Sequence, residues 1–164
     1  MLQLQDALLK KMYYWNCASI KGRGLNHGKK HIEKILKSDK KNTKYCLKLD
    51  VRKFYPSISK DVLKKKFQRI IKDKDTLWLI NIIIDSAESG IPIGNYTSQW
   101  FANFYLSDLD RYIKEELKIK HYVRYMDDMV LFSSNKKKLH NAKEKIDKFL
   151  SKEHLVLKNN WQLF

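Results

Sequence analysis

Residues 121–133 read HYVRYMDDMVLFS, in which an acidic pair separates two runs of strand-forming residues. This pattern predicts two antiparallel strands, His121–Met126 and Met129–Ser133, joined as a hairpin with Asp127 and Asp128 at or beside its turn. An Asp-Asp pair alone is most often a solvated turn. A solvated turn, however, does not need strands this apolar on both sides. The hairpin is therefore a candidate site as well as an element of the fold.

A second predicted strand brings another candidate carboxylate. Residues 45–51, YCLKLDV, carry Asp50 near the end of that strand. A strand end and a hairpin tip can lie side by side in one sheet, which would group Asp50 with Asp127 and Asp128. Crowded carboxylates repel one another and are costly to dehydrate unless a cation compensates. Two Mg²⁺ ions about 3.5–4 Å apart would stabilise the attacking and leaving oxygens of a phosphoryl transfer, and Mn²⁺ would satisfy the same ligands.

The remaining pattern predicts a mixed α+β fold. The expected helices span 2–15, 28–36, a segment capped by Ser57 or Ser59, 77–87, about 97–117, and a segment that Ser134 or Asn135 caps. Residues 77–87 are apolar on nearly all sides, which predicts a buried helix. Residues 155–157 predict a last short strand. This order of elements favours an antiparallel sheet with helices on one face.

Composition narrows the class of partner. The chain has 164 residues and a formal net charge of +16. Such an excess suits a polyanion, because Lys and Arg displace counterions from phosphates, although a solvated basic surface is the alternative. Cys17 and Cys46 fit neither a zinc pattern nor a disulfide framework, so we expect a reducing cytoplasm. No apolar run approaches the length of a membrane span.

Five segments resemble the ordered motifs of the reverse transcriptases. They are KGRG at 21–24, KLDVRKFYPSI at 48–58, GIPIGNYTSQ at 90–99, YMDD at 125–128 and LKNNWQ at 157–162. The loop Ile93-Gly94-x-x-x-Ser98-Gln99 differs from the Gln-Gly-x-x-x-Ser-Pro of retroviral and intron enzymes. It resembles the variant of bacterial and phage diversity-generating retroelement reverse transcriptases, and the ending Asn160-Trp161-Gln162 points the same way.

The resemblance implies a polymerase palm, an antiparallel sheet packed on helices in a ferredoxin-like core. We expect residues 1–44 to be partial fingers and 45–164 to be the palm, with finger-derived helices inserted at about 59–95 and the thumb absent. Relatives have further finger strands before the part that matches Met1 and a thumb after the part that matches Phe164. The resemblance therefore assigns activity to a longer protein and leaves activity of these residues alone open.

The implied activity is that of an RNA-directed DNA polymerase, a nucleotidyltransferase that uses two metal ions and is error-prone as in the retroelements. Asp50 and Asp127 would bind both metals, and Asp128 would assist at the same site. The backbone of Val51 would touch a metal or the triphosphate. Tyr55 would lie under the incoming sugar and exclude a 2′-hydroxyl, although a core aromatic residue beside a turn is the alternative.

The loop that begins at Gly90 would contact the nucleotide. Ile93 occupies a position where most relatives use Gln, close to the nascent base pair. Because Ile neither donates nor accepts a hydrogen bond, we expect relaxed selection of the incoming nucleotide at certain template bases. In the family that the loop resembles, these bases are adenines. Gly94 and Gln99 would also contact the nucleotide. Asn95 would contact nucleic acid or, alternatively, cap the next helix.

Basic residues complete the expected contacts. Lys21 and Arg23 lie in a Gly-flanked loop that can approach phosphates closely. Arg124 would contact the nucleic acid or support the acidic hairpin, and the sequence leaves both roles open. The expected partners are template RNA, a primer, a deoxynucleoside triphosphate and a small basic accessory protein, with no membrane. The alternatives are a defence-associated or group II intron-type reverse transcriptase, or a non-catalytic RNA-binding palm remnant.

Overall fold

A computed structural model describes residues 2–164, with side chains from Leu4 onward, and has a mixed α+β fold. Its helices are α1 Leu2–Leu9, α2 Leu25–Ser38, α3 Phe54–Ser57, α4 Lys60–Ile70, α5 Lys74–Asp85, α6 Tyr96–Tyr105, α7 Ser107–Arg111, the π-helix η1 Tyr112–Glu116 and α8 Lys136–Lys152. Its strands are β1 Tyr45–Leu49, β2 His121–Tyr125, β3 Asp128–Ser133 and β4 Gln162–Leu163. They form one four-stranded antiparallel sheet in the order β2-β3-β1-β4. The expected fold class is confirmed.

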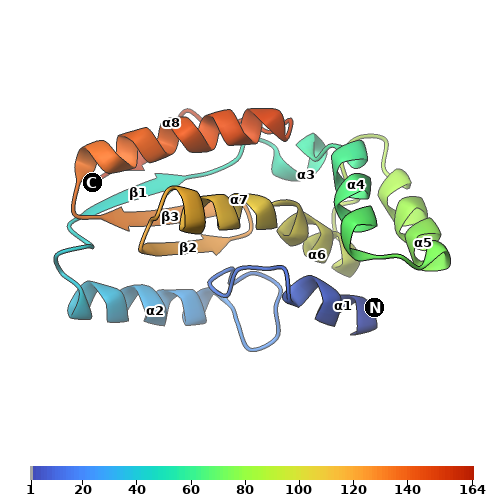
Figure 1. The fold of residues 1–164 in the computed structure, drawn as a ribbon, viewed down its shortest axis with the longest axis horizontal. Helices are drawn as coiled ribbons and strands as arrows, with labels where there is room; N and C mark the ends of the chain where they lie inside the picture. Colours follow the sequence, from blue (N-terminus) through green and yellow to red (C-terminus); the bar gives the residue numbers. More distant parts are fainter. Residues whose placement is uncertain (1) are drawn as a thin grey trace.

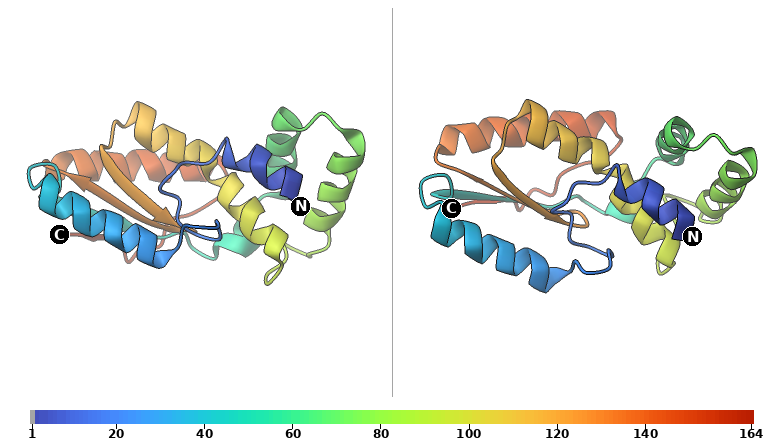
Figure 2. Two further views of the ribbon diagram at one scale, coloured as in Figure 1. Left: turned by 90° about the horizontal axis from the view of Figure 1, so that it is seen from below. Right: turned by 60° about the horizontal axis from the view of Figure 1, so that its bottom comes forward.

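Helices lie on both sides of the sheet (Figures 1 and 2). Helices α7 and α8 cover one side, and α2 runs along the other, which is clearest in the right view of Figure 2. The expectation of helices on a single face is therefore wrong. Gly28 is the point of close approach for α2, because a Cβ atom there would lie 3.3 Å from Cys17 Sγ and 3.6 Å from Val123 Cγ1. A Cβ atom there would press on the Cys17 side chain, while its distance to Val123 is that of an ordinary van der Waals contact.

Alternation along the strands divides the sheet into a closely packed face and a face of mixed polarity. The side chains that point toward α7 and α8 are almost completely buried: Leu47, Leu49, Tyr122, Met129 and Leu131. Because successive strand residues point to opposite faces, Lys48, Asp128 and Val130 point toward α2. A groove between α2 and the sheet is lined by these three residues. The sheet thus places Lys48 and Asp128 together on the α2 side.

The segment expected as one helix over 97–117 is divided into α6, α7 and η1. The break falls at Leu106, whose ψ of 1° leaves the helical range. Next to it, the Ser107 hydroxyl donates a hydrogen bond to the carbonyl of Phe104 at 2.7 Å. Such side-chain bonds compete with the helical backbone ladder. A local polar contact therefore interrupts a pattern whose apolar spacing is continuous.

The expected first helix, 2–15, ends early at Leu9. The residues beyond it pair with the outer edge of β2, where the Arg124 amide donates to the Trp15 carbonyl at 3.0 Å and Cys17 donates to the Arg124 carbonyl at 2.8 Å. Covering an open sheet edge satisfies backbone groups that a longer helix would leave unpaired. The expected strand at 155–157 is likewise reduced to a single bridge between Val51 and Leu157.

Helix α5 corrects the expectation of a buried helix at 77–87. Trp78 is 65 % exposed, Leu79 52 % and Ile82 47 %. The helix lies at one end of the molecule and packs against α4 (Figure 1), so only part of its apolar surface finds a partner in the described residues. Its N-cap is Asp73, which accepts a hydrogen bond from Thr76 N at 2.8 Å. None of the helices described for residues 2–164 is long and apolar enough to cross a membrane.

The expected helix caps at Ser59 and Asn135 are confirmed. The Ser59 hydroxyl accepts a hydrogen bond from Val62 N at 3.4 Å at the start of α4. The Asn135 side chain accepts from the amides of Lys137 and Lys138 at 2.8 and 3.3 Å at the start of α8. These bonds satisfy amides that the helix itself leaves without partners.

Gly90 fixes the loop before α6 against α3, and its substitution tests this packing. Gly90 has a φ of 62°, and a Cβ atom there would lie 1.9 Å from the carbonyl oxygen of Tyr55. Gly94→Ala is the matched control, since Gly94 has a φ of 90° but no atom lies within 4 Å of the position that its Cβ atom would take. We expect Gly90→Ala to lower the free energy of unfolding by at least about 2 kcal/mol more than the control does. Urea denaturation measures both, and equal losses would contradict the close packing.

Candidate active site

The three predicted carboxylates meet at one end of the sheet. The register pairs Leu49 with Met129, so Asp50, which follows Leu49, lies next to Asp128, which precedes Met129. Tyr125 pairs with Asp128, which leaves Met126 and Asp127 as a two-residue turn. The sheet thereby assembles side chains that are far apart in the sequence.

Crowding and partial burial change how these carboxylates titrate. Burial raises the pKa of Asp127 to about 6, and a hydrogen bond to Asp50 and the charges of Asp50 and Asp128 add to the rise. Burial and the charge of Asp50 also raise the pKa of Asp128, while Lys158 and Lys48 oppose this rise. A raised carboxylate pKa means that the negative charge is disfavoured at this place. A cation at the hairpin tip would remove that penalty.

Lys158 supplies one such charge, and the sequence analysis did not single it out. Its ammonium group forms an ion pair with Asp50 Oδ2, and its amide donates to the Asp50 carbonyl at 2.8 Å. The hydrogen bond to Asp50 raises the pKa of Lys158. Lys158 lies within the segment 157–162, whose resemblance to a family motif was the signal available in the sequence.

The carboxylates fit a divalent cation by their chemistry, although they are not preassembled around one. Among residues 2–164, no three His, Cys, Asp or Glu side chains are grouped in an arrangement ready to hold a metal, and Asp50 is turned toward Lys158. Hard cations such as Mg²⁺ take carboxylate oxygens. Burial, followed by the hydrogen bond to Asp50 and the charges of Asp50 and Asp128, raises the pKa of Asp127, and a bound cation would offset this disfavoured negative charge.

Tyr55 lies beside the acidic turn. Its hydroxyl is 3.8 Å from Met126 Sδ, and burial followed by the charge of Asp127 raises its pKa. Val51, the neighbour of Asp50, is completely buried and bridges to Leu157. Any contact that Val51 makes with a ligand beside Asp50 would therefore come from its backbone and not from its side chain.

The loop at 90–99 is joined to this region through Tyr55, whose carbonyl accepts a hydrogen bond from Ile91 N at 3.3 Å. Ile93 is 76 % exposed, a high value for an aliphatic side chain. Asn95 is also exposed and stands at the N-cap of α6, but its side chain makes no capping hydrogen bond. Asn95 thus occupies the N-cap position of the capping alternative without the side-chain bond, and its contact with nucleic acid stays a prediction. Gln99 is half-buried in the first turns of α6.

The two basic residues of the 21–24 loop differ in their contacts. Lys21 is exposed. Arg23 donates through Nη1 to the Tyr14 carbonyl at 2.9 Å, and its guanidinium lies 4.5 Å from the centre of the Tyr14 ring. Arg23 thus holds the loop against the chain before it, while Lys21 faces solvent.

Arg124 supports the acidic hairpin from inside the fold. It is 0 % exposed, which contradicts the expected contact with nucleic acid and leaves the supporting role. Its guanidinium makes two hydrogen bonds to Asp110, from Nε at 2.8 Å and Nη2 at 2.6 Å. Nη1 donates to the Met126 carbonyl at 2.8 Å. Met126 has a φ of 53°, a strained conformation for a residue with a side chain, and this bond helps to hold it.

The Arg124 network includes Tyr122 of the same strand and reaches two further segments. Tyr122 donates to Asp110 Oδ1 at 2.8 Å, and Arg124 Nη1 donates to Asn103 Oδ1 at 3.1 Å. Asn103 in turn donates to the Ala18 carbonyl at 2.9 Å. The turn that carries Asp127 is therefore linked to β2, α6, α7 and the segment after α1.

A groove of about 510 Å³ runs between α2 and the facing side of the sheet and reaches Asp128. Lys29 and Ile32 line it from α2, and Lys48 and Val130 line it from the sheet. The groove combines apolar walls with two lysines and two carboxylates, since Glu33 of α2 lines it together with Asp128. It offers the carboxylates an open approach for a charged, partly apolar ligand.

Comparisons with known proteins point in one direction. The profile of the family described as reverse transcriptase (RNA-dependent DNA polymerase) matches residues 1–160. The retron Ec73 reverse transcriptase of Escherichia coli is 34 % identical over 115 residues, which cover 62 % of this chain and 36 % of that protein. The chain thus spans about a third of this relative's length.

Solved structures share the fold at low sequence identity. Telomerase from Candida tropicalis, in complex with a TWJ fragment of telomeric RNA, matches this chain with a TM-score of 0.74 and 17 % identity. The match covers 99 % of this chain and 32 % of the telomerase chain. Telomerase from Candida albicans, also in complex with a TWJ fragment of telomeric RNA, matches with a TM-score of 0.75 and 15 % identity. This match covers 99 % of the present chain and 33 % of the telomerase chain. These similarities concern the fold.

Breaking the buried pair of Arg124 and Asp110 should lower the free energy of unfolding more than replacing both residues does. We expect Arg124→Met to lower the free energy of unfolding by about 3–5 kcal/mol, because Asp110 would be left buried without a counter-charge. Adding Asp110→Leu should recover much of that loss. Lys158→Met, which breaks a half-exposed pair, is the control and should cost no more than about 1 kcal/mol. Urea denaturation tests the series, and a single substitution as mild as the control would refute the supporting role.

Proposed function

The chain belongs to the reverse transcriptase (RNA-dependent DNA polymerase) family, and on that premise we propose that it forms the catalytic part of an enzyme that extends a primer on an RNA template. The observation that carries the proposal is the sheet register, which brings Asp50 beside Asp128 and the turn that bears Asp127. The raised pKa of Asp127, caused by burial and then by Asp50 and Asp128, supports it, because a partly buried group of carboxylates is a poor surface for binding RNA alone. A site for cations explains the cluster better.

Asp50, Asp127 and Asp128 would hold two divalent cations, Mg²⁺ or Mn²⁺, with the backbone of Val51 as a further oxygen ligand. When bound, such ions stabilise the attacking and leaving oxygens of a phosphoryl transfer. Lys158 faces the same place and balances part of the negative charge through Asp50. These residues would therefore orient the reacting groups, and the protein would contribute position and charge.

The surroundings of the carboxylates support nucleic acid and a nucleotide as ligands. The groove that reaches Asp128 has largely apolar walls with Lys29 and Lys48 among them, and the chain has a net charge of +16. Tyr55 contacts Met126 next to Asp127, a position suited to sensing the sugar of a deoxynucleoside triphosphate. Lys21 and the exposed Asn95 are candidates for contact with the strands, and Gly94 and Gln99 for contact with the nucleotide.

Within the family, the sequence of the 93–99 loop favours the diversity-generating retroelement type, and identity to the retron Ec73 enzyme favours a retron-like relative. The exposed Ile93 supports the first, because its side chain cannot report on base pairing through hydrogen bonds. The retroelement type would also imply a small basic accessory protein. We propose that residues 1–44 serve as partial fingers and 45–164 as the palm, with helices inserted at about 59–95.

Substitution of Asp127 tests the catalytic proposal. In the gene product that carries these residues, Asp127→Asn should slow primer extension on an RNA template at least about a thousandfold, which corresponds to about 4 kcal/mol. RNA binding should be unchanged or tighter, because a negative charge is lost. Asp75→Asn, at an exposed position in α5, is the control and should extend normally. Unchanged extension by Asp127→Asn would leave an RNA-binding platform as the better account.

Substitution of Ile93 tests the error-prone proposal. Ile93→Gln would restore a group able to hydrogen-bond near the new base pair. We expect it to lower misincorporation opposite template adenines about tenfold, the effect of one hydrogen bond of about 1.4 kcal/mol. Ile93→Met keeps an apolar side chain and should leave the error rate as it is. Sequencing of the products measures both, and an equal error rate in Ile93→Gln would contradict the role of Ile93.

A further inference from the structure

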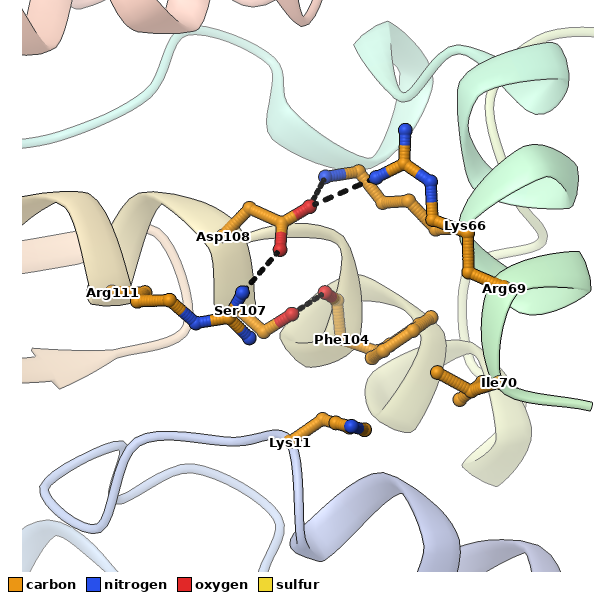
Figure 3. A pocket seen from close by; sticks show the side chains of 8 residues that line it. All are labelled: Lys11, Lys66, Arg69, Ile70, Phe104, Ser107, Asp108 and Arg111. Atoms are coloured by element: carbon orange, nitrogen blue, oxygen red, sulfur yellow. Dashed lines mark hydrogen bonds and ion pairs between the residues drawn. The ribbon is translucent and has the colours of Figure 1, made fainter.

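A small pocket lies on the packed side of the molecule, where the end of α1, helix α4 and the α6–α7 segment meet (Figure 3). Its volume is about 200 Å³, and it shares no lining residue with the groove at Asp128. Basic side chains from three separate segments border it: Lys11 after α1, Lys66 and Arg69 on α4, and Arg111 on α7. The candidate active site does not use any of them.

One of these cations is already neutralised. Lys66 is 4 % exposed, and its ammonium donates to Asp108 Oδ2 at 2.6 Å. Glu153 Oε2 lies 3.0 Å from the same nitrogen. The two carboxylates outweigh the single charge of Lys66. Lys66 and its partners therefore form a fixed structural cluster at the back of the pocket.

The other cations keep their hydrogen-bonding groups available. Arg69 is 71 % exposed and Arg111 52 % exposed, and one nitrogen of each lies 3.8 Å from an Asp108 oxygen. That distance is too long for a hydrogen bond. Figure 3 shows the two guanidinium groups on either side of Asp108, with Lys11 on the opposite wall. Counting Asp108 and Glu153 against all four cations leaves an excess of two positive charges.

The groups that line the pocket suit a phosphate group. Its remaining wall is apolar, formed by Ile70 and the buried Phe104. Guanidinium groups present paired N–H donors that match phosphate oxygens. Because both arginines are more than half exposed, they can reach a ligand that passes over the surface. An extended polyanion satisfies this arrangement better than a small ligand that must be enclosed.

We propose that this pocket binds a phosphodiester group of an RNA strand, through Arg69, Arg111 and Lys11. The inference rests on the proposed function in taking RNA as the polyanion, and it adds a contact on the side of the sheet opposite the carboxylates. An RNA that follows the protein from the groove at Asp128 to this pocket would wrap around the molecule. The pocket therefore anchors structured RNA outside the reaction site.

A double substitution tests the pocket. Arg69→Gln/Arg111→Gln removes two exposed donors, and Lys40→Gln/Lys41→Gln removes two exposed charges from the turn before β1 as the control. The Kd for a fluorescent RNA hairpin is measured by anisotropy over a series of salt concentrations. We expect the arginine variant to bind the RNA about tenfold more weakly. The slope of log Kd against log salt concentration should be smaller by about one to two. The control should lose less than half as much in both quantities.

Titration with inorganic phosphate separates an RNA contact from a site for a small ligand. Wild-type protein and both variants are titrated with phosphate by calorimetry, and thermal unfolding checks that each variant folds. Equal weakening of RNA binding in the two double variants would overturn the proposal, since charge alone would explain it. Phosphate binding that depends on the arginines while RNA binding does not would also overturn it and assign the pocket to a small phosphate.

Primer extension by Asp127→Asn keeps the two proposals apart. Loss of RNA affinity in the arginine variant supports the pocket whether or not the wild-type protein extends a primer. Normal RNA affinity in that variant, with extension that depends on Asp127, overturns the pocket and leaves the proposed function intact.

Discussion

The buried ion pair between Arg124 and Asp110 is the constraint on which the other parts of the structure depend. Arg124 lies on β2 and Asp110 on α7, so the pair fixes the angle at which the helical layer meets the sheet. A buried ion pair contributes little net stability compared with an apolar pair. What it supplies is a single geometry, because the guanidinium donors have fixed directions. The same guanidinium holds the Met126 carbonyl, and the helical core thereby determines the shape of the acidic turn.

The sheet separates a stabilising face from a reactive one. On the helical side, apolar residues and the Arg124 network lower the energy of the fold. On the α2 side, the end of the sheet collects negative charge and backbone strain, with Met126 at a φ of 53° and Lys53 at 47°, three residues after Asp50. Strained and mutually repelling groups persist only where the surrounding structure holds them in place. Lys158 lowers this cost by pairing with Asp50.

Sequence patterns predicted the parts of the molecule that depend on local periodicity. The hairpin, β1, and the capped helices α4 and α8 follow from alternation, helical spacing and N-cap residues. The break at Leu106 within the expected helix 97–117 did not follow, because it coincides with a local hydroxyl contact at Ser107 that apolar spacing does not reveal. The exposure of Trp78 was also missed, since an apolar helix predicts burial without naming a partner. The grouping of Asp50 with the acidic pair was predictable from the motifs, whereas the ion pair with Lys158 and the burial of Arg124 depend on the register.

That register has a genetic consequence. Successive residues of β2 and β3 point to opposite faces, and the turn between them contains only Met126 and Asp127. Losing or gaining one codon between Tyr122 and Asp128 would invert one strand relative to the other. Arg124 would then point into the groove, or Asp128 into the core. The geometry of the sheet therefore constrains the length of this stretch of the gene as well as the amino acids that it encodes.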